Sequence, residues 1–355
     1  MNTSATVLRG TIPDECVMYK LLGGKLDDTT TEAFAVLVFI VVISIITCSV
    51  IISLNVLVIV AVKTKARLKT NSNIALACLA VTDGLVGAVA QPMFIASRLS
   101  TLQSETSYQY CILDQSTSNA IRFLCAASIA HMVSINVERY LAIKHPFTST
   151  VMVTKARLLA SSALAWTVAS VATIPVMITD KRIYLTSNNI LMAICLGIIT
   201  FCQVTVYAHS RRHEKQIAAQ QISAEARQNF LKEKKALKIT TGAVVVLLLC
   251  YLPILVVRTL LVTSAITSKN IAYICFYTAA LVTLSNSFIN PVIYCVRMRQ
   301  FRVTFIEILL RKNHTQAEQF ERRMFGRLNI VALPGAAGEG EITAPDDEDE
   351  GNGID

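Results

Sequence analysis

Apolar residues gather in seven long runs separated by shorter polar segments. The runs cover roughly residues 33–62, 71–96, 111–143, 158–179, 188–209, 239–263 and 271–296. The first, fourth, fifth and seventh runs contain no Asp, Glu, Lys or Arg. About 20 helical residues cross a hydrocarbon core of ~30 Å. The pattern therefore predicts an all-α membrane protein, a bundle of seven transmembrane helices.

The parts of the chain outside these runs predict three further segments. Residues 1–32 are polar and contain no short apolar core, which predicts an extracellular N-terminal segment without a cleavable signal peptide. Residues 297–312 alternate basic residues with apolar ones at helical spacing, which favours a short amphipathic helix on the membrane surface. Residues 313–355 end in an acidic run and predict a disordered cytoplasmic tail.

Positive charge falls mainly on one side of the predicted membrane. Fifteen Lys and Arg residues lie in the loops after the first, third and fifth runs. Only four lie in the alternate loops: Arg98, Lys181, Arg182 and Lys269. Since such residues collect on the cytoplasmic side, we expect a multi-pass protein of the plasma membrane with its N-terminus outside and its C-terminus inside. The net charge of +9 then faces anionic membrane lipids, and no clustered basic and aromatic surface indicates nucleic-acid binding.

Polar residues inside the seventh run carry the most specific pattern. Asn286, Asn290 and Tyr294 recur every fourth residue, so they form one stripe along a helix. Pro291 lacks an amide donor, which frees the carbonyl of Ser287 and bends the helix. Polar groups and a bend at membrane depth are costly unless the segment moves or binds something. The stripe therefore predicts a conformational relay.

Motifs in the other runs complete a recognisable order. The third run ends in Glu138-Arg139-Tyr140 at its inner edge. The remaining motif residues, one in each run, are Asn55, Asp83, Trp166, Tyr207 and Pro253. Over about residues 33–310 the chain resembles the rhodopsin-like (class A) G-protein-coupled receptors. The resemblance implies a receptor for an extracellular ligand that activates a heterotrimeric G protein.

Departures from the usual pattern of that family indicate a subgroup. The fifth run has no Pro, and Ile199 stands at the expected site. Tyr251 replaces the usual Trp ahead of Pro253, and the outer loop at about 180–187 has no Cys. These features resemble the melanocortin, lysophospholipid, cannabinoid and adenosine receptor group. Melanocortin receptors are the most similar in them, although Asp114 is the only carboxylate at the top of the third run.

The resemblance implies a switch at the inner end of the bundle. Arg139 pairs with Glu233 across the third and sixth helices in the resting state. The sixth helix then swings outward about the Pro253 bend, and the opened cavity accepts the tail of a Gα subunit. The alternative is that Arg139 only reaches lipid phosphate. The residues of the switch are Glu138, Arg139, Tyr140, Tyr207, Glu233 and Tyr294.

Asp83 is the only charged residue of the second run. An unpaired carboxylate in apolar surroundings takes up a proton or recruits a cation. The resemblance places Ser128, Asn286 and Asn290 around it, with Asn55 in the same network, and implies a sodium ion that stabilises the inactive state. The alternative is a neutral Asp83 in a water-mediated polar network. We expect no other cofactor.

The resemblance places the ligand between the outer halves of the third, fifth, sixth and seventh helices. Ile121 occupies the position where amine receptors carry an Asp, so a simple amine is disfavoured. The region offers instead Arg122, Arg258 and the aromatic donors Tyr251, Tyr273 and Tyr277. Two guanidinium groups in apolar helices favour an anionic or lipid-like ligand. The alternative is that Arg122 faces Asp114 while Arg258 reaches the outer headgroups.

Covalent features are expected on the outer side. The cysteines expected near the oxidising face are Cys16, Cys111 and Cys275. A disulfide from Cys16 to Cys111 and one from Cys16 to Cys275 are both possible pairings. Asn2-Thr3-Ser4 is a glycosylation sequence, which makes Asn2 the candidate acceptor.

Other classes of membrane protein fit the sequence less well. Hydrophobic residues make up 53% of the chain and charged residues 16%, unlike a soluble domain. An opsin needs a Lys where Leu284 stands, and a small-solute transporter, the remaining alternative, typically shows repeated halves that are missing here. The sequence contains no cluster of a nucleophile, a base or metal ligands that would predict an enzyme. His131 is expected to be a hydrogen-bonded contact between helices.

Overall fold

The computed structural model describes most of the chain between the first predicted helix and the tail. The described residues are Leu22, 31–101, 107–144, 154–173, 181–219 and 224–331. Contacts divide the chain into two compact units, Met1–Phe305 and Ile306–Asp355. Within the described residues every element is a helix and there is no strand, which confirms the all-α fold.

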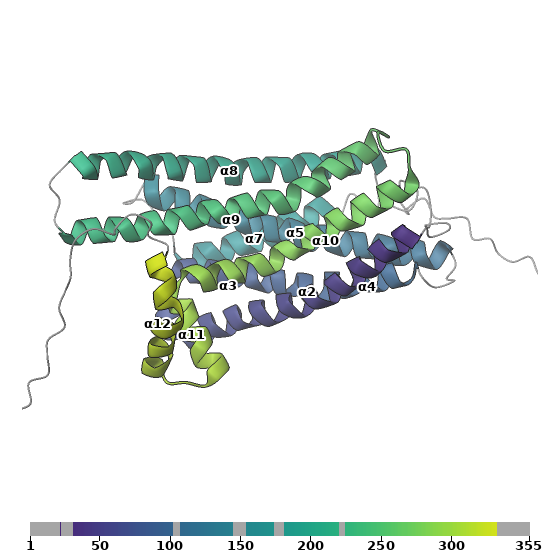
Figure 1. The fold of residues 1–355 in the computed structure, drawn as a ribbon. Coiled ribbons are helices and arrows are strands. Elements are labelled where there is room, and N and C mark those ends of the chain that lie inside the picture. The colour runs from purple at the N-terminus through teal and green to yellow at the C-terminus, as the bar shows by residue number, and fades with distance from the viewer. Residues whose placement is uncertain are drawn as a thin grey trace, which may run out of the picture. The chain divides into compact units, whose positions relative to one another are not determined.

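The helices follow the order of the apolar runs (Figure 1). The membrane-length elements are α2 (Thr31–Thr64), α3 (Asn71–Leu85) continued by η2 (Val86–Ala90) and α4 (Gln91–Leu99), α5 (Ser107–Lys144), α7 (Lys155–Thr173), α8 (Lys181–Ala219), α9 (Ala224–Val262) and α10 (Lys269–Arg297). The short helices are η1 (Ala66–Leu68), α11 (Arg299–Leu310) and α12 (His314–Val331). Six of the described helices are long and apolar enough to span a membrane. The remaining one, α7, ends at Thr173, and residues 174–180 of the predicted fourth run lie outside the described part.

Several predicted boundaries are wrong because helices continue past the apolar runs. α8 begins at Lys181, so Lys181 and Arg182 belong to its first turn and not to an outer loop reaching residue 187. Arg98 lies in the last turn of α4 and is fully buried, although the charge pattern assigned it to a loop. At the inner side α8 and α9 run on to Ala219 and back to Ala224 as polar helices. Apolar runs mark the lipid-embedded part of a helix, not its ends.

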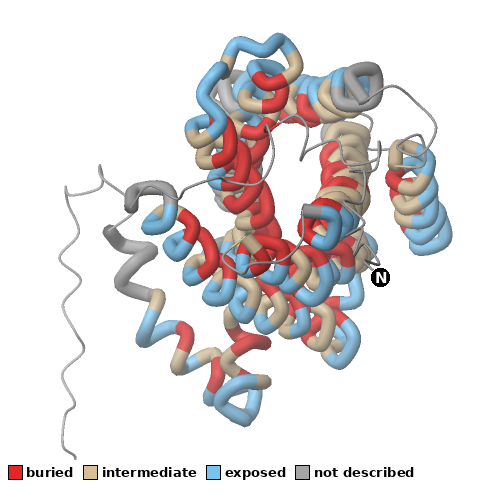
Figure 2. The backbone as a smooth tube through the Cα atoms, turned by 90° about the vertical axis from the view of Figure 1, so that its right-hand side faces the viewer, coloured by how far each residue is buried: buried red, intermediate tan, exposed pale blue. Residues whose placement is uncertain are grey.

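The long helices pack side by side into one bundle, and α5 contacts several of the others. α5 packs against α3, α7 and α8, while α9 joins α8 to α10, and α2 joins α10 to α3. Figure 2 shows buried residues turned toward the inside of the bundle and exposed residues on its outer side. The outer side carries large apolar side chains such as Phe39, Leu164, Phe201 and Leu249. An apolar outside is the reverse of a soluble bundle and fits a lipid environment.

The second membrane helix is interrupted by one turn of π-helix, η2. Pro92 follows directly in the first turn of α4, where it has no amide hydrogen to donate to the turn before it. Gly87 lies in η2, and a Cβ atom there would lie 2.7 Å from Cγ2 of Ile51 on α2. A side chain at Gly87 would therefore push α2 away from the second helix.

The C-terminal segment differs from its prediction. α11 lies within the predicted amphipathic segment, 297–312. The prediction of disorder from residue 313 is wrong for His314–Val331, which form α12. Phe320 and Met324 lie one turn apart and give this helix an apolar side, and the Lys312 ammonium lies 4.3 Å from the Phe320 ring centroid. Residues 332–355, with the acidic run, lie outside the described part.

Candidate functional site

Asp83 is fully buried in α3 and joins three helices through hydrogen bonds. Its Oδ1 accepts hydrogen bonds from Ser128 Oγ of α5 and Ser287 Oγ of α10, each 2.9 Å long. Its Oδ2 accepts one from Asn290 Nδ2, also 2.9 Å long. The structure thus brings the expected Ser128 and Asn290 onto this carboxylate. Ser287 was missed, although it lies one turn before Asn290 on the same helix face.

Asn55 links the first helix to the proline turn of the seventh. Its Nδ2 donates to the carbonyl of Ser287 at 3.0 Å and to the carbonyl of Ile51 at 2.9 Å. Pro291 leaves the Ser287 carbonyl without its usual helical donor, so Asn55 replaces that donor. Asn286 behaves differently from expectation. Its Nδ2 is buried without a hydrogen-bond partner in the described residues, so its amide does not bond to Asp83.

Arg139 is half-buried at the inner end of α5. Tyr294 of α10 is buried and lies within electrostatic reach of this guanidinium. Glu138 accepts a hydrogen bond of 3.0 Å from Ser72 Oγ at the start of α3. The expected partner of Arg139 on the sixth helix, Glu233, lies in α9, and its side chain is outside the described part.

The two remaining tyrosines of the expected switch, Tyr207 and Tyr140, contact other residues of α5 and α8. Tyr207 of α8 is 37% exposed and its hydroxyl accepts from Arg211 Nε at 3.1 Å. The ring of Tyr140 lies 6.5 Å from that of Phe201, centroid to centroid, and its hydroxyl accepts from Lys144 Nζ. Among the switch residues with described side chains, Tyr294 lies within electrostatic reach of Arg139, and the pairing of Arg139 with Glu233 stays a prediction.

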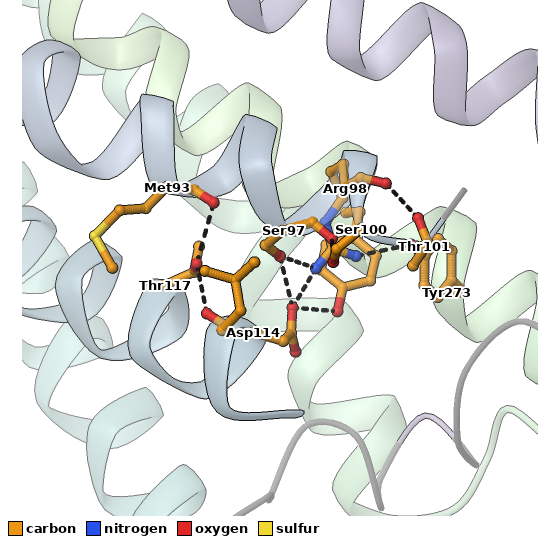
Figure 3. Close-up of polar contacts among 10 residues, drawn as sticks. Met93, Ser97, Arg98, Ser100, Thr101, Asp114, Thr117 and Tyr273 are labelled. Atoms are coloured by element: carbon orange, nitrogen blue, oxygen red, sulfur yellow. Dashed lines mark hydrogen bonds and ion pairs between the residues drawn. The ribbon is translucent and has the colours of Figure 1, made fainter. Parts of the chain in front are cut away.

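A buried ion pair links α4 and α5 near the end of the bundle at which α5 begins (Figure 3). Arg98 of α4 pairs with Asp114 of α5, and both side chains are almost fully buried. Arg98 Nη1 donates to the Tyr273 hydroxyl at 2.8 Å, and the Tyr277 hydroxyl donates to Asp114 Oδ1 at 3.0 Å. The guanidinium carbon lies 3.4 Å from the Tyr277 ring centroid, close enough for a cation–π interaction.

The ion pair adds a partner that was not expected in the ligand region. Asp114 pairs with Arg98, and it also lines the smaller cavity together with Arg122, so the alternative in which Arg122 faces Asp114 stays open. Tyr273 and Tyr277, which were expected to contact the ligand, hydrogen-bond to the two members of this pair, and Tyr277 also lines the smaller cavity. No pattern in the sequence predicts this pair, because Arg98 and Asp114 belong to different helices and the charge pattern assigned Arg98 to a loop.

Arg122 and Arg258 line the same two cavities in the outer half of the bundle. Counting the space open to the surroundings, the larger has a volume of about 640 Å³ and the smaller about 400 Å³. Arg122 of α5 is 5% exposed and Arg258 of α9 is 7% exposed. Arg258 therefore points into the bundle and does not reach outer headgroups, which corrects the second half of the alternative. Neither Tyr251 nor Tyr273 is among the residues that line these two cavities.

The cysteines narrow the choice of disulfide. Cys111 at the top of α5 is disulfide-bonded, whereas Cys275 of α10 is free. A bridge between Cys16 and Cys275 is therefore wrong. Cys16 lies outside the described residues, as does Asn2, so the Cys16–Cys111 bridge and the glycosylation of Asn2 stay predictions.

His131 joins α5 to α7 as expected for a hydrogen-bonded helix contact. Its Nδ1 lies 2.8 Å from the carbonyl of Ala127, so Nδ1 carries the proton and donates. Its Nε2 then accepts from Ser162 Oγ at 2.8 Å. The ring also meets Trp166 edge-on, with centroids 6.0 Å apart. The histidine therefore serves the packing of α7 on α5.

Comparison with known proteins agrees with this arrangement. Residues 54–294 match the family described as 7 transmembrane receptor (rhodopsin family). The chain is 23% identical to the mouse adenosine receptor A2b over 70% of its own length and 83% of the relative's. It is 25% identical to the chicken adenosine receptor A2b over 68% of its length and 79% of the relative's. It is 24% identical to the human adenosine receptor A2a over 76% and 71%, respectively.

These relatives belong to one of the receptor groups that the sequence departures indicated. The family match covers more than half of the chain and contains the Asp83 network, Arg139 and both cavity arginines. The family has seven membrane helices. In the described residues six helices are long and apolar enough to cross a membrane, and α7 is the seventh helix of the bundle. The chain is a multi-pass membrane protein and belongs to the rhodopsin family of seven-transmembrane receptors, which signal through G proteins and are not enzymes.

Proposed function

We propose that the chain is a plasma-membrane receptor, with its N-terminus outside, that binds an anionic extracellular ligand between α5, α9 and α10. Ligand binding moves α9 outward at its inner end and activates a heterotrimeric G protein. Family membership supports the receptor and sets aside the transporter alternative. The observation that carries the ligand proposal is the placement of Arg122 and Arg258 around one cavity.

The charge balance around the cavities supports an anion. Among the described lining residues the charged ones are Arg122, Arg258 and Asp114. Asp114 also pairs with Arg98. Two guanidinium groups and one carboxylate therefore line cavities with otherwise mostly apolar walls, where electrostatic attraction is stronger than in water. The planar fork of arginine matches a carboxylate or a phosphate.

A nucleoside is the second candidate, because the relatives are named adenosine receptors. Adenosine carries no anionic group, whereas adenosine 5′-monophosphate combines a nucleoside with a phosphate. The two candidates therefore predict opposite orders of potency for this pair of probes. The anionic proposal expects the monophosphate to be more potent than adenosine.

Removing either cavity arginine is expected to weaken an anionic agonist. We expect Arg122→Ala and Arg258→Ala each to lower potency by about 10- to 100-fold, because a charge-assisted hydrogen bond contributes roughly 1.5–3 kcal/mol. The measurement is G-protein activation in cells at matched surface expression, with adenosine 5′-monophosphate and 1-oleoyl lysophosphatidic acid as probes. Arg122→Lys and Arg258→Lys are controls that keep the charge and remove the fork, and we expect intermediate losses. Unchanged potency in both alanine variants would refute the anionic ligand.

The Asp83 network is the proposed site of a sodium ion that stabilises the resting state. Carboxylate and hydroxyl oxygens are the ligands that small hard cations prefer, and Asp83, Ser128 and Ser287 supply them from three helices. The described residues contain no group of three His, Cys, Asp or Glu side chains, so a transition-metal site has no support there. The ion would couple α3 and α10 to the helix that carries Arg139.

Exchange of sodium for potassium tests this site. We expect basal nucleotide exchange by the wild-type receptor to rise several-fold in potassium, about the size of a 1 kcal/mol coupling. Asp83→Asn keeps the size of the side chain but removes its charge, so its exchange rate should not depend on the cation. Ser170→Ala, which removes a hydroxyl of α7 that donates to the Trp166 carbonyl of the same helix, serves as the control that keeps the dependence. Wild-type activity that is the same in both salts would contradict the proposal.

A further inference from the structure

We infer that the larger cavity opens sideways into the bilayer between α7 and α8. Its ligand would be an amphiphile with an anionic head and an apolar tail, drawn from the outer leaflet. This inference rests on the proposed anionic ligand and adds the chemical class of the ligand and its route of entry.

The wall of the larger cavity has a charged end and an apolar end. The charged end is formed by Arg122 and Arg258, which are buried between α5 and α9. The rest of the wall on α5, α7 and α8 is apolar apart from Asn188, and its apolar residues include Ala126, Ala130, Val168, Leu191, Met192 and Cys195. A small water-soluble anion would use only the first end. An amphiphile would use both.

Exposure shows on which side the cavity is open. The lining residues of α9 and α10 include Ile254, Arg258 and Thr283, all of them buried. Val168 of α7 is 41% exposed, and Met192 of α8 is partly exposed. The open side of the cavity is therefore the side of α7 and α8.

The packing of the helices explains the opening. α7 and α8 both pack closely on α5, but they make few contacts with each other. The outer faces of both helices carry exposed apolar residues, such as Val171 at 62% and Phe201 at 64%, which is the surface that lipid covers. An opening between two such faces meets lipid chains.

The direction of the cavity matches the direction of a lipid in the outer leaflet. Arg122 and Ala130 are separated by eight residues of α5, about 12 Å along the helix. With the N-terminus outside, α5 runs inward from Ser107, so on this helix Arg122 lies nearer the outer surface and the apolar Ala126 and Ala130 lie nearer the membrane centre. An outer-leaflet amphiphile has its head and tail in the same order.

A pair of tryptophan variants tests the route of entry on the full-length receptor in phosphatidylcholine nanodiscs. Val168→Trp places a bulky side chain in the opening. Val171→Trp places the same side chain on the exposed face of the same helix, away from the cavity lining. Matched thermal stability of the two variants excludes a folding defect. The probes are tritiated 1-oleoyl lysophosphatidic acid and glycerol 3-phosphate, which has the same head and no tail.

We expect Val168→Trp to slow association of the lysophosphatidic acid about tenfold, while Val171→Trp binds like the wild type. Glycerol 3-phosphate should compete at least about 100-fold more weakly, the effect of burying a few methylene groups. The double variant of Arg122→Ala and Arg258→Ala should lose affinity for the lysophosphatidic acid, although the opening between α7 and α8 is not altered.

The outcomes separate this inference from the proposal beneath it. Normal association in Val168→Trp, with affinity lost in the arginine double variant, would overturn lateral entry and leave the anionic ligand standing. Equal binding of glycerol 3-phosphate would overturn the amphiphile and favour a water-soluble anion. If the arginine double variant binds the lysophosphatidic acid as tightly as the wild type, both the anionic ligand and this inference are overturned.

Discussion

Replacing Arg98 with Ala should lower the free energy of unfolding of the receptor by about 3–5 kcal/mol, the usual effect of leaving one buried charge without its partner. Asp114 would keep its charge at a site with almost no solvent access, because both side chains are nearly fully buried. The Tyr273 hydroxyl would lose its donor as well. The measurement is thermal unfolding of the purified receptor, compared with the exposed-site variant Arg211→Ala.

A double variant separates the effect of the unpaired charge from the effect of lost packing. Arg98→Met combined with Asp114→Leu removes both charges and keeps apolar volume, so most of the stability should return. An Arg98→Ala variant that unfolds at the wild-type temperature would contradict the role of the ion pair. Equal losses in the single and double variants would assign the effect to packing rather than to charge.

Loss of Arg139 should abolish coupling to the G protein. We expect Arg139→Ala to reduce agonist-stimulated nucleotide exchange roughly 100-fold, near the upper range of coupling between two sites, while surface expression is unchanged. The reason is that Arg139 lies at the inner end of α5, within electrostatic reach of the buried Tyr294. Glu233→Ala should instead raise basal exchange if Glu233 is the resting partner of Arg139, as the resemblance to the family implies.

Controls for the switch come from the same helices. Ser134→Ala removes a hydroxyl of α5 that donates to the Ala130 carbonyl of the same helix, and it should leave coupling intact. Tyr294→Phe keeps the ring that packs 6.0 Å from Phe301, centroid to centroid, and removes only the hydroxyl, so it tests whether that group holds Arg139 in the active state. An Arg139→Ala receptor that reaches the surface and signals normally would refute the switch.

The sequence predicts the helices well because apolar runs of membrane length admit few alternatives. It predicts their ends poorly, since α8 and α9 continue into polar residues that lie beyond the membrane. α12 was missed because the acidic run beyond it suggested disorder for the whole tail, whereas Phe320 and Met324 already had helical spacing.

The polar network was predictable in part, because Asp83 is the only charge in its run and Asn290 belongs to a spaced stripe. Ser287 could have been found from the same helical spacing. Arg98 could not, because its partner Asp114 lies in another helix and a charged residue at the end of an apolar run is ordinarily assigned to a loop. Distant pairings of this kind depend on the packing of α4 against α5, which periodicity does not encode.

The rate of nucleotide exchange on purified heterotrimeric G proteins tests the central claim most directly. The full chain in nanodiscs is mixed with each class of heterotrimer, with and without 1-oleoyl lysophosphatidic acid, and binding of a non-hydrolysable GTP analogue is followed. We expect at least one class to exchange faster with the receptor, faster again with the probe, and at its unassisted rate with Arg139→Ala. Exchange that stays at the unassisted rate in every class, with a folded receptor and with the probe bound, would contradict the account.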